Sequence, residues 1–543
     1  ALDRILSQLD RIETQTSARD GDQARLEYEK EYRAAVVRKL DWVELVGVTL
    51  PSRYHQLPLQ DAFVSLDLDD EAEDNPDSDD DAITTRSCEE VFDALGLGCG
   101  RLLIEGPAGS GKTTLMRWVA ITAAPFTPAA RNRRDGLNYT GRPDDPDSFR
   151  ILDDGEVQRL RTDWRNRVPF LIVLRNTEGR FPSPEDFPVR LAQEIGTPPA
   201  SWVRGVLQEG RAIVLIDGVD EVPLRSRNDL RADIQALVEA YPPENYFLVT
   251  TRPDVVDAGW LRPTGFREVS VSPMGPDEVD RFVDQWHAAY ARRLVVEGHQ
   301  KDLTAQAAKL KRDVRREPAL AQLATNPLMC GMICALNDHS QGKPPQSLSG
   351  LCRSLCDMFL HGRDDGRDLP NELVDPEYER LKPEQKRAAL KQLAVRFVEE
   401  GKSALPAPLA EKVVRDQLAF YPGSDPTKAA AVFRGLLERS GMLRESYPAQ
   451  GGRPAEIEFI HNTFKEYLAG EWFAAGERIT QLLEKLNDPG WQKVTLFAVR
   501  NDQYPGFATQ VIRKLLAMGK NPDLVFALQC QSVALLLERV SVM

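Results

Sequence analysis

A glycine-rich segment that follows a short apolar run has the residues best suited to phosphate chemistry. The apolar run is Leu102-Leu103-Ile104, and the segment after it reads Gly106-Pro107-Ala108-Gly109-Ser110-Gly111-Lys112-Thr113-Thr114. A glycine, four residues and Gly-Lys-Thr between a strand and a helix is the spacing of a phosphate-binding loop. Its glycines let backbone N–H groups face phosphate oxygens. We therefore expect the whole segment to bind ATP or ADP, with Lys112 on the phosphates and the Thr113 hydroxyl on Mg²⁺.

Acidic residues follow a second apolar run, Ala212-Ile213-Val214-Leu215-Ile216, which is typical of a strand buried in a parallel sheet. Asp217 ends this run, and we expect it to hold Mg²⁺ together with Thr113, directly or through a water. Hydrolysis also needs a carboxylate that orients a water, and both Asp220 and Glu221 are candidates. The alternative interpretation of this pair is an acidic cluster at the start of a helix.

An arginine follows a third apolar run, Tyr246-Phe247-Leu248-Val249-Thr250. Arg252 lies just past this predicted strand, where a guanidinium could contact the γ-phosphate. A surface salt bridge is the alternative role for Arg252. Asp220, Glu221 and Arg252 are therefore the predicted catalytic residues.

The elements that must position these residues alternate between apolar runs and helical patterns. That alternation predicts an α/β fold with a parallel, doubly wound sheet, and ligands bind such sheets at the carboxyl ends of the strands. Helical patterns fill the chain after residue 275, and two short strands near 442–444 and 457–460 surround a Pro/Gly-rich loop in a winged-helix-like arrangement. The predicted domains are an N-terminal helical region (1–48), a linker with an acidic loop at 67–81 (49–86), a nucleotide-binding domain (87–270), a helical domain (271–365), a winged-helix domain (366–475) and a C-terminal helical domain (476–543).

Composition excludes several other classes of protein. The 543 residues carry a net charge of −14, which argues against broad non-specific binding to nucleic acid. We find no apolar run near the ~20 residues that a membrane helix needs. The seven cysteines are an odd number, which suits a reducing cytoplasm better than a disulfide framework. Two pairs, Cys330/Cys334 and Cys352/Cys356, have helical spacing, and we favour buried thiols over a metal site there.

Four segments, in this order, resemble the motifs of the NACHT family of STAND P-loop NTPases. They are Asp217-Gly218-Val219-Asp220-Glu221, Thr250-Thr251-Arg252-Pro253, Asn326-Pro327-Leu328 and Phe459-Ile460-His461-Asn462-Thr463-Phe464-Lys465-Glu466-Tyr467-Leu468-Ala469. The resemblance covers roughly residues 87–475. The segment Leu57-Pro58-Leu59 and the compact architecture are similar to bacterial NACHT proteins of the antiphage, NLR-like type.

The resemblance implies a switch built from nucleotide-binding, helical and winged-helix domains, with ADP held between them at rest. It implies that Pro327 contacts the adenine side and that His461 contacts the β-phosphate of ADP, although a core histidine is the alternative for His461. It further implies a slow, cytoplasmic ATPase that exchanges ADP for ATP after a trigger and then oligomerises in innate immune, antiphage signalling. The trigger is unknown, with a phage component as one candidate, and so is the effector; we expect neither membrane nor nucleic acid as a partner.

Two other functions fit the residues less well. A housekeeping P-loop ATPase would show steady turnover as a monomer. A regulatory scaffold would bind DNA through its winged helix, but the acidic balance and the lack of a basic recognition helix in the sequence argue against it.

Overall fold

The structure is a computed structural model. It describes residues 23–42, 57–70, 84–95, 100–107, 109–125, 132–134, 137–142, 145–151, 163–174, 177, 181–188, 195–222, 226–253, 256–296, 303–339, 348–361, 376–402, 404–420, 425–440, 442–447, 454–486, 488–501 and 503–518. The chain forms two compact units, and the main division between them falls between Pro273 and Met274. We call them the first and the second unit.

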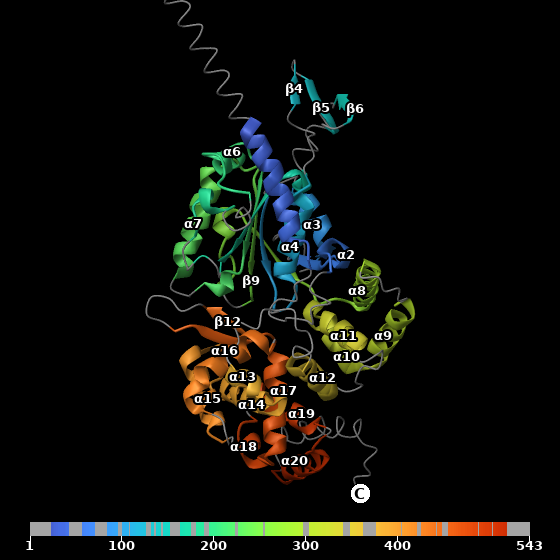
Figure 1. Ribbon diagram of the computed structural model, residues 1–543, viewed down its shortest axis with the longest axis vertical. Helices are drawn as coiled ribbons and strands as arrows, with labels where there is room; N and C mark the ends of the chain where they lie inside the picture. The colour runs from blue at the N-terminus through green and yellow to red at the C-terminus, as the bar shows by residue number, and fades with distance from the viewer. Residues whose placement is uncertain are drawn as a thin grey trace, which may run out of the picture. The chain divides into compact units, whose positions relative to one another are not determined.

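A seven-stranded sheet organises the first unit (Figure 1). Its strands, in spatial order, are β2 (Thr84–Ser87), β1 (Asp67–Asp70), β10 (Arg267–Val271), β3 (Arg101–Glu105), β9 (Tyr246–Thr251), β8 (Ala212–Asp217) and β7 (Val168–Val173). The five strands from β10 to β7 are parallel, and β1 and β2 add an antiparallel edge. The predicted α/β, parallel sheet is therefore confirmed.

Helices cover this sheet, which explains why its central strands are continuous apolar runs. Every residue of β8 and of β9 is buried, as expected for strands covered on both faces. Besides a helix over residues 23–40, the described helices of the first unit include α2 (Leu59–Ala62), α3 (Cys88–Leu95), α4 (Lys112–Ala123), α6 (Trp202–Gln208) and α7 (Arg227–Ala240). Helix α4 packs against β7 and β8. It follows β3 after a short loop, so its first residues lie at the carboxyl ends of the strands.

The edge strand β1 corrects the prediction of an acidic loop over residues 67–81. The first four of those residues, Asp67–Asp70, form a strand between β10 and β2. Alternation buries Leu68 and Asp70, and the Asp70 carboxylate pairs with Arg86 at 2.7 Å and Arg267 at 3.2 Å. These cations offset the charge that an acidic strand would otherwise bury without a partner. The rest of the predicted loop, 71–81, lies outside the described residues.

A helix over residues 23–40, which we call the N-terminal helix, packs against the β7 edge of the sheet. Its Tyr28 and Tyr32 rings meet Trp202 edge-on at centroid distances of 5.0 and 5.3 Å. The Tyr32 hydroxyl donates to the Pro169 carbonyl of β7 at 2.9 Å. The predicted N-terminal helical pattern is confirmed for these residues, whereas its first part, 1–22, lies outside the described chain.

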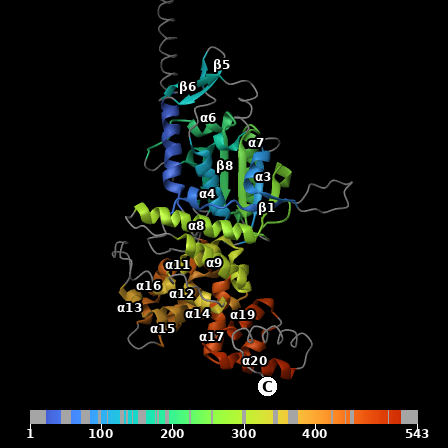
Figure 2. The same ribbon diagram turned by 90° about the vertical axis from the view of Figure 1, so that its right-hand side faces the viewer.

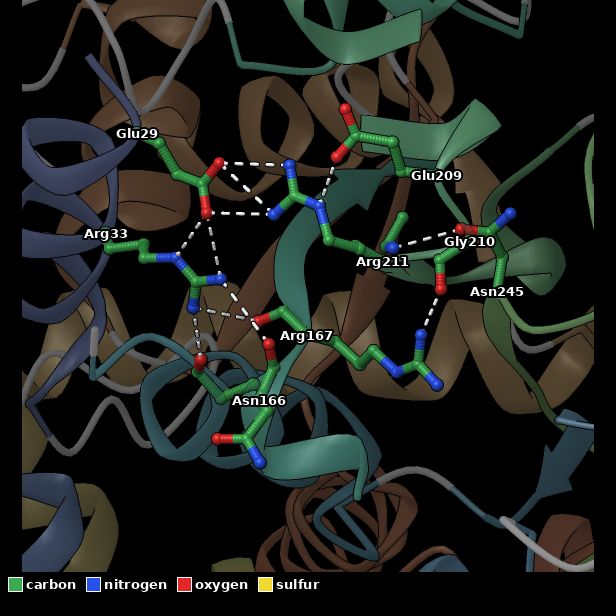
Figure 3. A network of polar contacts seen from close by, with 10 residues as sticks. Glu29, Arg33, Asn166, Arg167, Glu209, Gly210, Arg211 and Asn245 are labelled. Carbon is green, nitrogen blue, oxygen red and sulfur yellow. Dashed lines mark hydrogen bonds and ion pairs between the residues drawn. The ribbon is translucent and has the colours of Figure 1, made fainter. Parts of the chain in front are cut away.

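A buried charge cluster fixes the N-terminal helix (Figure 3). The Glu29 carboxylate accepts hydrogen bonds from Arg33 at 3.2 Å and from Arg211 at 3.0 Å. The Arg33 guanidinium also donates to the Ala123 carbonyl at 2.9 Å and the Arg167 carbonyl at 3.0 Å. Ala123 ends α4, while Arg167 and Arg211 directly precede β7 and β8. The cluster therefore ties the N-terminal helix to the end of α4 and to the starts of β7 and β8.

The segment between α4 and β7 contains a small antiparallel sheet. Its strands are β4 (Asn132–Arg134), β5 (Leu137–Arg142) and β6 (Asp145–Ile151). A short 3₁₀ turn at Trp164–Asn166 then leads into β7.

The second unit is mostly helical (Figure 2). Its helices are α8 (Pro276–Val296), α9 (Thr304–Arg316), α10 (Pro318–Ala324), α11 (Pro327–His339), α12 (Leu348–His361), α13 (Pro376–Arg380), α14 (Pro383–Glu399), α15 (Ala407–Leu418), α16 (Ala429–Arg439), α17 (Asn462–Ala475), α18 (Ile479–Leu483), α19 (Pro489–Val499) and α20 (Pro505–Met518). A three-stranded antiparallel sheet has the order β11 (Ala404–Pro406), β13 (Glu456–Phe459) and β12 (Leu443–Tyr447). The two predicted strands are confirmed, and β11 is a third that the apolar pattern did not indicate.

Helix α17 lies at the centre of its part of the second unit. It packs against α14 and α19, and the buried Glu471 carboxylate accepts from Arg387 of α14 at 2.8 Å. At Gly470 a Cβ would lie 2.8 Å from the Ala498 backbone nitrogen and 2.8 Å from the Val494 carbonyl oxygen of α19. Only glycine fits such a close approach of two helix backbones.

The described cysteines carry no disulfide, and those of both helical pairs are buried. Within the described ranges no group of three or more His, Cys, Asp or Glu side chains could hold a metal ion. We also find no helix in the described part of the chain that is both long and apolar enough to cross a membrane.

Candidate nucleotide-binding site

The predicted phosphate-binding loop connects β3 to α4. Gly109 and Gly111 have φ angles of +78° and +94°, which residues with a Cβ rarely adopt. The Gly106 N–H donates to the Thr251 carbonyl at 3.2 Å, which ties the loop to the end of β9. The turn therefore has the strand–loop–helix context that the motif requires.

Polar groups of this loop suit an anion. The Lys112 ammonium donates to the carbonyls of Gly106 and Pro107, the latter at 3.1 Å, so the side chain folds back onto the loop. The Ser110 hydroxyl is buried without a hydrogen-bond partner in the structure. A buried hydroxyl in that condition costs free energy, and a phosphate oxygen would satisfy it. Thr114 lies in the first turn of α4, and Ala108 lies outside the described residues.

The Asp217 carboxylate lies at the end of β8, beside the loop. It is 4% exposed, and its Oδ2 accepts from the Thr113 hydroxyl at 2.8 Å. A hydroxyl and a carboxylate oxygen in contact are the hard oxygen donors that Mg²⁺ prefers. The structure therefore brings together the two side chains predicted to hold the metal.

Thr250 is part of one of the predicted motifs, but its side-chain contact with Asp217 was not predicted. Its hydroxyl donates to Asp217 Oδ1 at 2.6 Å and accepts from the Gly218 N–H at 3.0 Å. The signal was a threonine inside an otherwise apolar run. Its significance depends on the pairing register of β8 and β9, which aligns Ile216 with Val249 and so sets Asp217 beside Thr250.

The predicted catalytic acids and the arginine also lie near the strand ends. Arg252 Nε forms an ion pair with Asp220 Oδ2 at 2.7 Å, and their side chains are 24% and 9% exposed. Gly218 has a φ of +91°, and a Cβ there would lie 2.9 Å from the Glu221 carboxylate. The two acids therefore have different surroundings: Asp220 contacts the arginine, whereas Glu221 folds back toward Gly218.

The other two predicted contacts belong to the second unit. Pro327 is the first residue of α11, a position that its fixed φ favours. His461 precedes α17 and caps it, because its Nδ1 accepts from the Thr463 N–H at 3.2 Å. That bond leaves the ring proton on Nε2, which is therefore a donor. Burial, together with the positive charge of Lys493, lowers the pKa of His461 to about 4, so the ring is neutral near pH 7.

These features define a class before any comparison is made. A parallel α/β sheet whose strand ends carry a glycine-rich loop, a lysine, a threonine and an aspartate is the architecture of a P-loop NTPase. Residues 156–290 match the family model of the NACHT domain, so this part of the chain is similar to the NACHT family. The match spans β7, β8 and β9, and it includes Asp217 and Arg252. The predicted resemblance to the NACHT family is thereby confirmed.

Several solved structures match parts of this chain. The Orc1 protein of Aeropyrum pernix in complex with DNA is 12% identical, with a TM-score of 0.29 over 71% of this chain and 91% of that one. The Cdc6p protein from Pyrobaculum aerophilum is 12% identical, with a TM-score of 0.25 over 70% and 93%. A RuvB variant from Thermotoga maritima is 11% identical, with a TM-score of 0.25 over 68% and 87%. At these identities and TM-scores the matches do not indicate a function. No curated protein matches the sequence of this chain.

Proposed function

We propose that the chain is an ATP/ADP-switched NTPase of the STAND type that acts in NLR-like, antiphage innate immunity. The observation that carries this proposal is the Asp217 carboxylate, held by the Thr113 hydroxyl at 2.8 Å beside a glycine-rich loop. In the proposal the chain holds ADP at rest, exchanges it for ATP after a trigger and then oligomerises.

Nucleotide binding follows from the loop. The N–H groups of the loop and the Lys112 ammonium would hold the phosphates, and the Ser110 hydroxyl would gain a partner. Thr113 and Asp217 would hold Mg²⁺, which neutralises charge on the β- and γ-phosphates. Both donors are oxygen atoms already in contact, so the residues present fit this ion.

Hydrolysis would use the ion pair between Asp220 and Arg252. Arg252 cannot lose its charge, and a γ-phosphate would compete with Asp220 for it. A carboxylate released from this pair could accept a proton from an attacking water. Glu221 is the other candidate for this role. Because Asp220 must leave its ion pair with Arg252 before it can act as a base, this arrangement favours slow hydrolysis over rapid turnover.

The switch itself would depend on the second unit. The helices α14 to α16 with the sheet β11-β13-β12 support a winged-helix interpretation, and His461 lies at its last strand. A neutral His461 with its proton on Nε2 would donate to a phosphate oxygen of ADP, and Pro327 would contact the adenine side. ATP would favour another arrangement only through different contacts with these residues.

The biological role follows from the resemblance to bacterial NLR-like proteins. The proposed partners are further copies of this chain in the cytoplasm, a trigger such as a phage component, and a downstream effector. We propose neither a membrane nor a nucleic acid as partner.

The first experiment identifies the nucleotide carried by the purified protein. We expect ADP to be released on denaturation of the wild type, and Lys112→Ala to weaken ADP binding about 100-fold, which is about 2.7 kcal/mol. Chromatography of the released nucleotide and titration with a fluorescent ADP analogue measure both. Lys309→Ala, at a half-exposed lysine of α9, is the control and should bind as the wild type does. Absence of any ADP or ATP binding by the wild type would contradict the proposal, and fast hydrolysis by a monomer would favour a housekeeping ATPase.

A further inference from the structure

Thr250 lies at a point where one hydroxyl can control the metal-binding carboxylate. It is the penultimate residue of β9 and is fully buried. Its hydroxyl has a single proton, and that proton is directed at Asp217 Oδ1, 2.6 Å away. The hydroxyl oxygen at the same time accepts from the Gly218 N–H at 3.0 Å. The orientation of the hydroxyl is therefore fixed from both sides.

Both oxygens of Asp217 are thus committed to threonine hydroxyls. Oδ1 accepts from Thr250 on the neighbouring strand, and Oδ2 accepts from Thr113 at the start of α4. Of these two contacts only the one to Thr113 involves a predicted metal ligand. The contact to Thr250 sets the rotation of the carboxylate without occupying the side that faces Thr113.

We infer that Thr250 is a positioning residue, which orients the Asp217 carboxylate toward the divalent cation of a bound nucleotide. This inference rests on the proposed function. Thr250 acts through Asp217 and through the turn at Gly218, so it should influence the metal more than the nucleotide. Hydrogen-bond partners of metal ligands commonly change metal affinity by about 10- to 100-fold when they are removed.

The test separates metal affinity from nucleotide affinity. In Thr250→Val a methyl group replaces the hydroxyl at nearly constant volume. We expect fluorescent ADP in EDTA to bind this variant within about twofold of the wild type. We expect the MgCl₂ concentration that gives half of the Mg²⁺-dependent increase in affinity to rise about tenfold. Thr250→Ser keeps the hydroxyl and should restore the wild-type value.

Thr251→Val is the matched control. Thr251 is equally buried and is the next residue of β9, so its side chain points to the other face of the sheet. Its hydroxyl donates only weakly, at 3.3 Å, to the Arg252 carbonyl. This variant should keep the wild-type Mg²⁺ dependence, which shows that loss of a buried hydroxyl in β9 is not itself the cause.

Other outcomes overturn the inference. An unchanged Mg²⁺ dependence in Thr250→Val, or equal losses of affinity in EDTA and in MgCl₂, would leave Thr250 a structural residue only. If the valine variant does not fold, Thr250→Ala removes the same hydroxyl without adding a methyl in its place, and the same criteria apply. A wild type that binds fluorescent ADP without any Mg²⁺ dependence overturns the inference but not the switch. A wild type that binds no nucleotide overturns both.

Discussion

At the scale of single residues, His461 shows how burial prepares a side chain for a role that its type alone does not reveal. The Nδ1 atom is engaged by the Thr463 N–H, and the ring is neutral because burial and then Lys493 lower its pKa to about 4. A neutral imidazole with its proton on Nε2 donates one hydrogen bond and adds no charge. In the proposed switch such a contact would recognise a phosphate oxygen by its position and not by its charge.

The lowered pKa predicts a pH dependence of stability. In the unfolded chain the pKa of His461 is about 6.5, so between pH 6.5 and pH 4 the unfolded state binds a proton that the folded state does not. The stability contributed by neutral His461 is complete above pH 6.5 and is lost as the pH falls toward 4. We expect His461→Gln, which does not titrate, to lose less stability than the wild type between pH 7 and pH 5, as measured by urea unfolding.

A second variant checks the cause of this shift. Lys493→Met removes the nearby positive charge, so the pKa of His461 should rise and the pH-dependent loss of stability should become smaller. Parallel stability curves for the wild type and His461→Gln would contradict this interpretation.

Some residues of the candidate site can be predicted from a continuous stretch of sequence, and others cannot. The loop at 106–114 and Asp217 could be predicted because motif and apolar run are continuous in sequence. The pairing of Arg252 with Asp220 and the role of Thr250 could not, because each depends on which strands are neighbours and in what register. A parallel sheet brings together residues that are about 30 positions apart, and no local pattern records that pairing.

At the scale of elements, the cluster around Glu29 makes the N-terminal helix a part of the first unit. Arg33 contacts the last residue of α4, so a cation lies at the C-terminal end of the helix whose other end carries Lys112. A positive charge there complements the helix dipole. The N-terminal helix therefore contacts α4 at the end opposite to Lys112. Composition and helical spacing alone did not indicate this contact.

This arrangement predicts a large effect of one buried carboxylate. Glu29→Ala would leave the buried Arg33 and the partly buried Arg211 without their shared carboxylate, and we expect the free energy of unfolding of the first unit to fall by about 3 kcal/mol. Glu209→Ala is the control, because Glu209 also contacts Arg211, at 2.6 Å, but is 54% exposed and should cost less than about 1 kcal/mol. Denaturant unfolding compares the two, and equal effects would contradict the role of burial.

The strands show a similar limit of prediction. The apolar runs that became β3, β8 and β9 could be recognised because covered strands need no alternation. Strand β1 was hidden because its residues are mostly aspartates, and only the arginines that β2 and β10 bring to Asp70 make its burial tolerable. A run of acidic residues predicts a loop, but it can form a strand when basic residues on the neighbouring strands pair with it.

At the scale of the whole molecule, the net charge of −14 bears on the proposed oligomer. Like charges on assembling copies repel, and added salt screens that repulsion. We expect the protein to have the mass of one chain with ADP and a larger mass with a non-hydrolysable ATP analogue, with more of the large form at 0.3 M than at 0.05 M NaCl. Light scattering after gel filtration measures this. Lys112→Ala should keep the mass of one chain under all four conditions, and a wild type that never changes mass would contradict the oligomeric switch.

The close approach at Gly470 has a mechanical consequence. With the two backbones in direct contact there, α17 and α19 have no side-chain layer that could absorb a shift between them. From residue 470 back to residue 461 the helix runs about 13 Å, so a tilt of about 15° around that junction displaces its capping histidine by about 3.5 Å. A tilt of α17 driven from the C-terminal helices would therefore move the imidazole farther than a hydrogen bond tolerates.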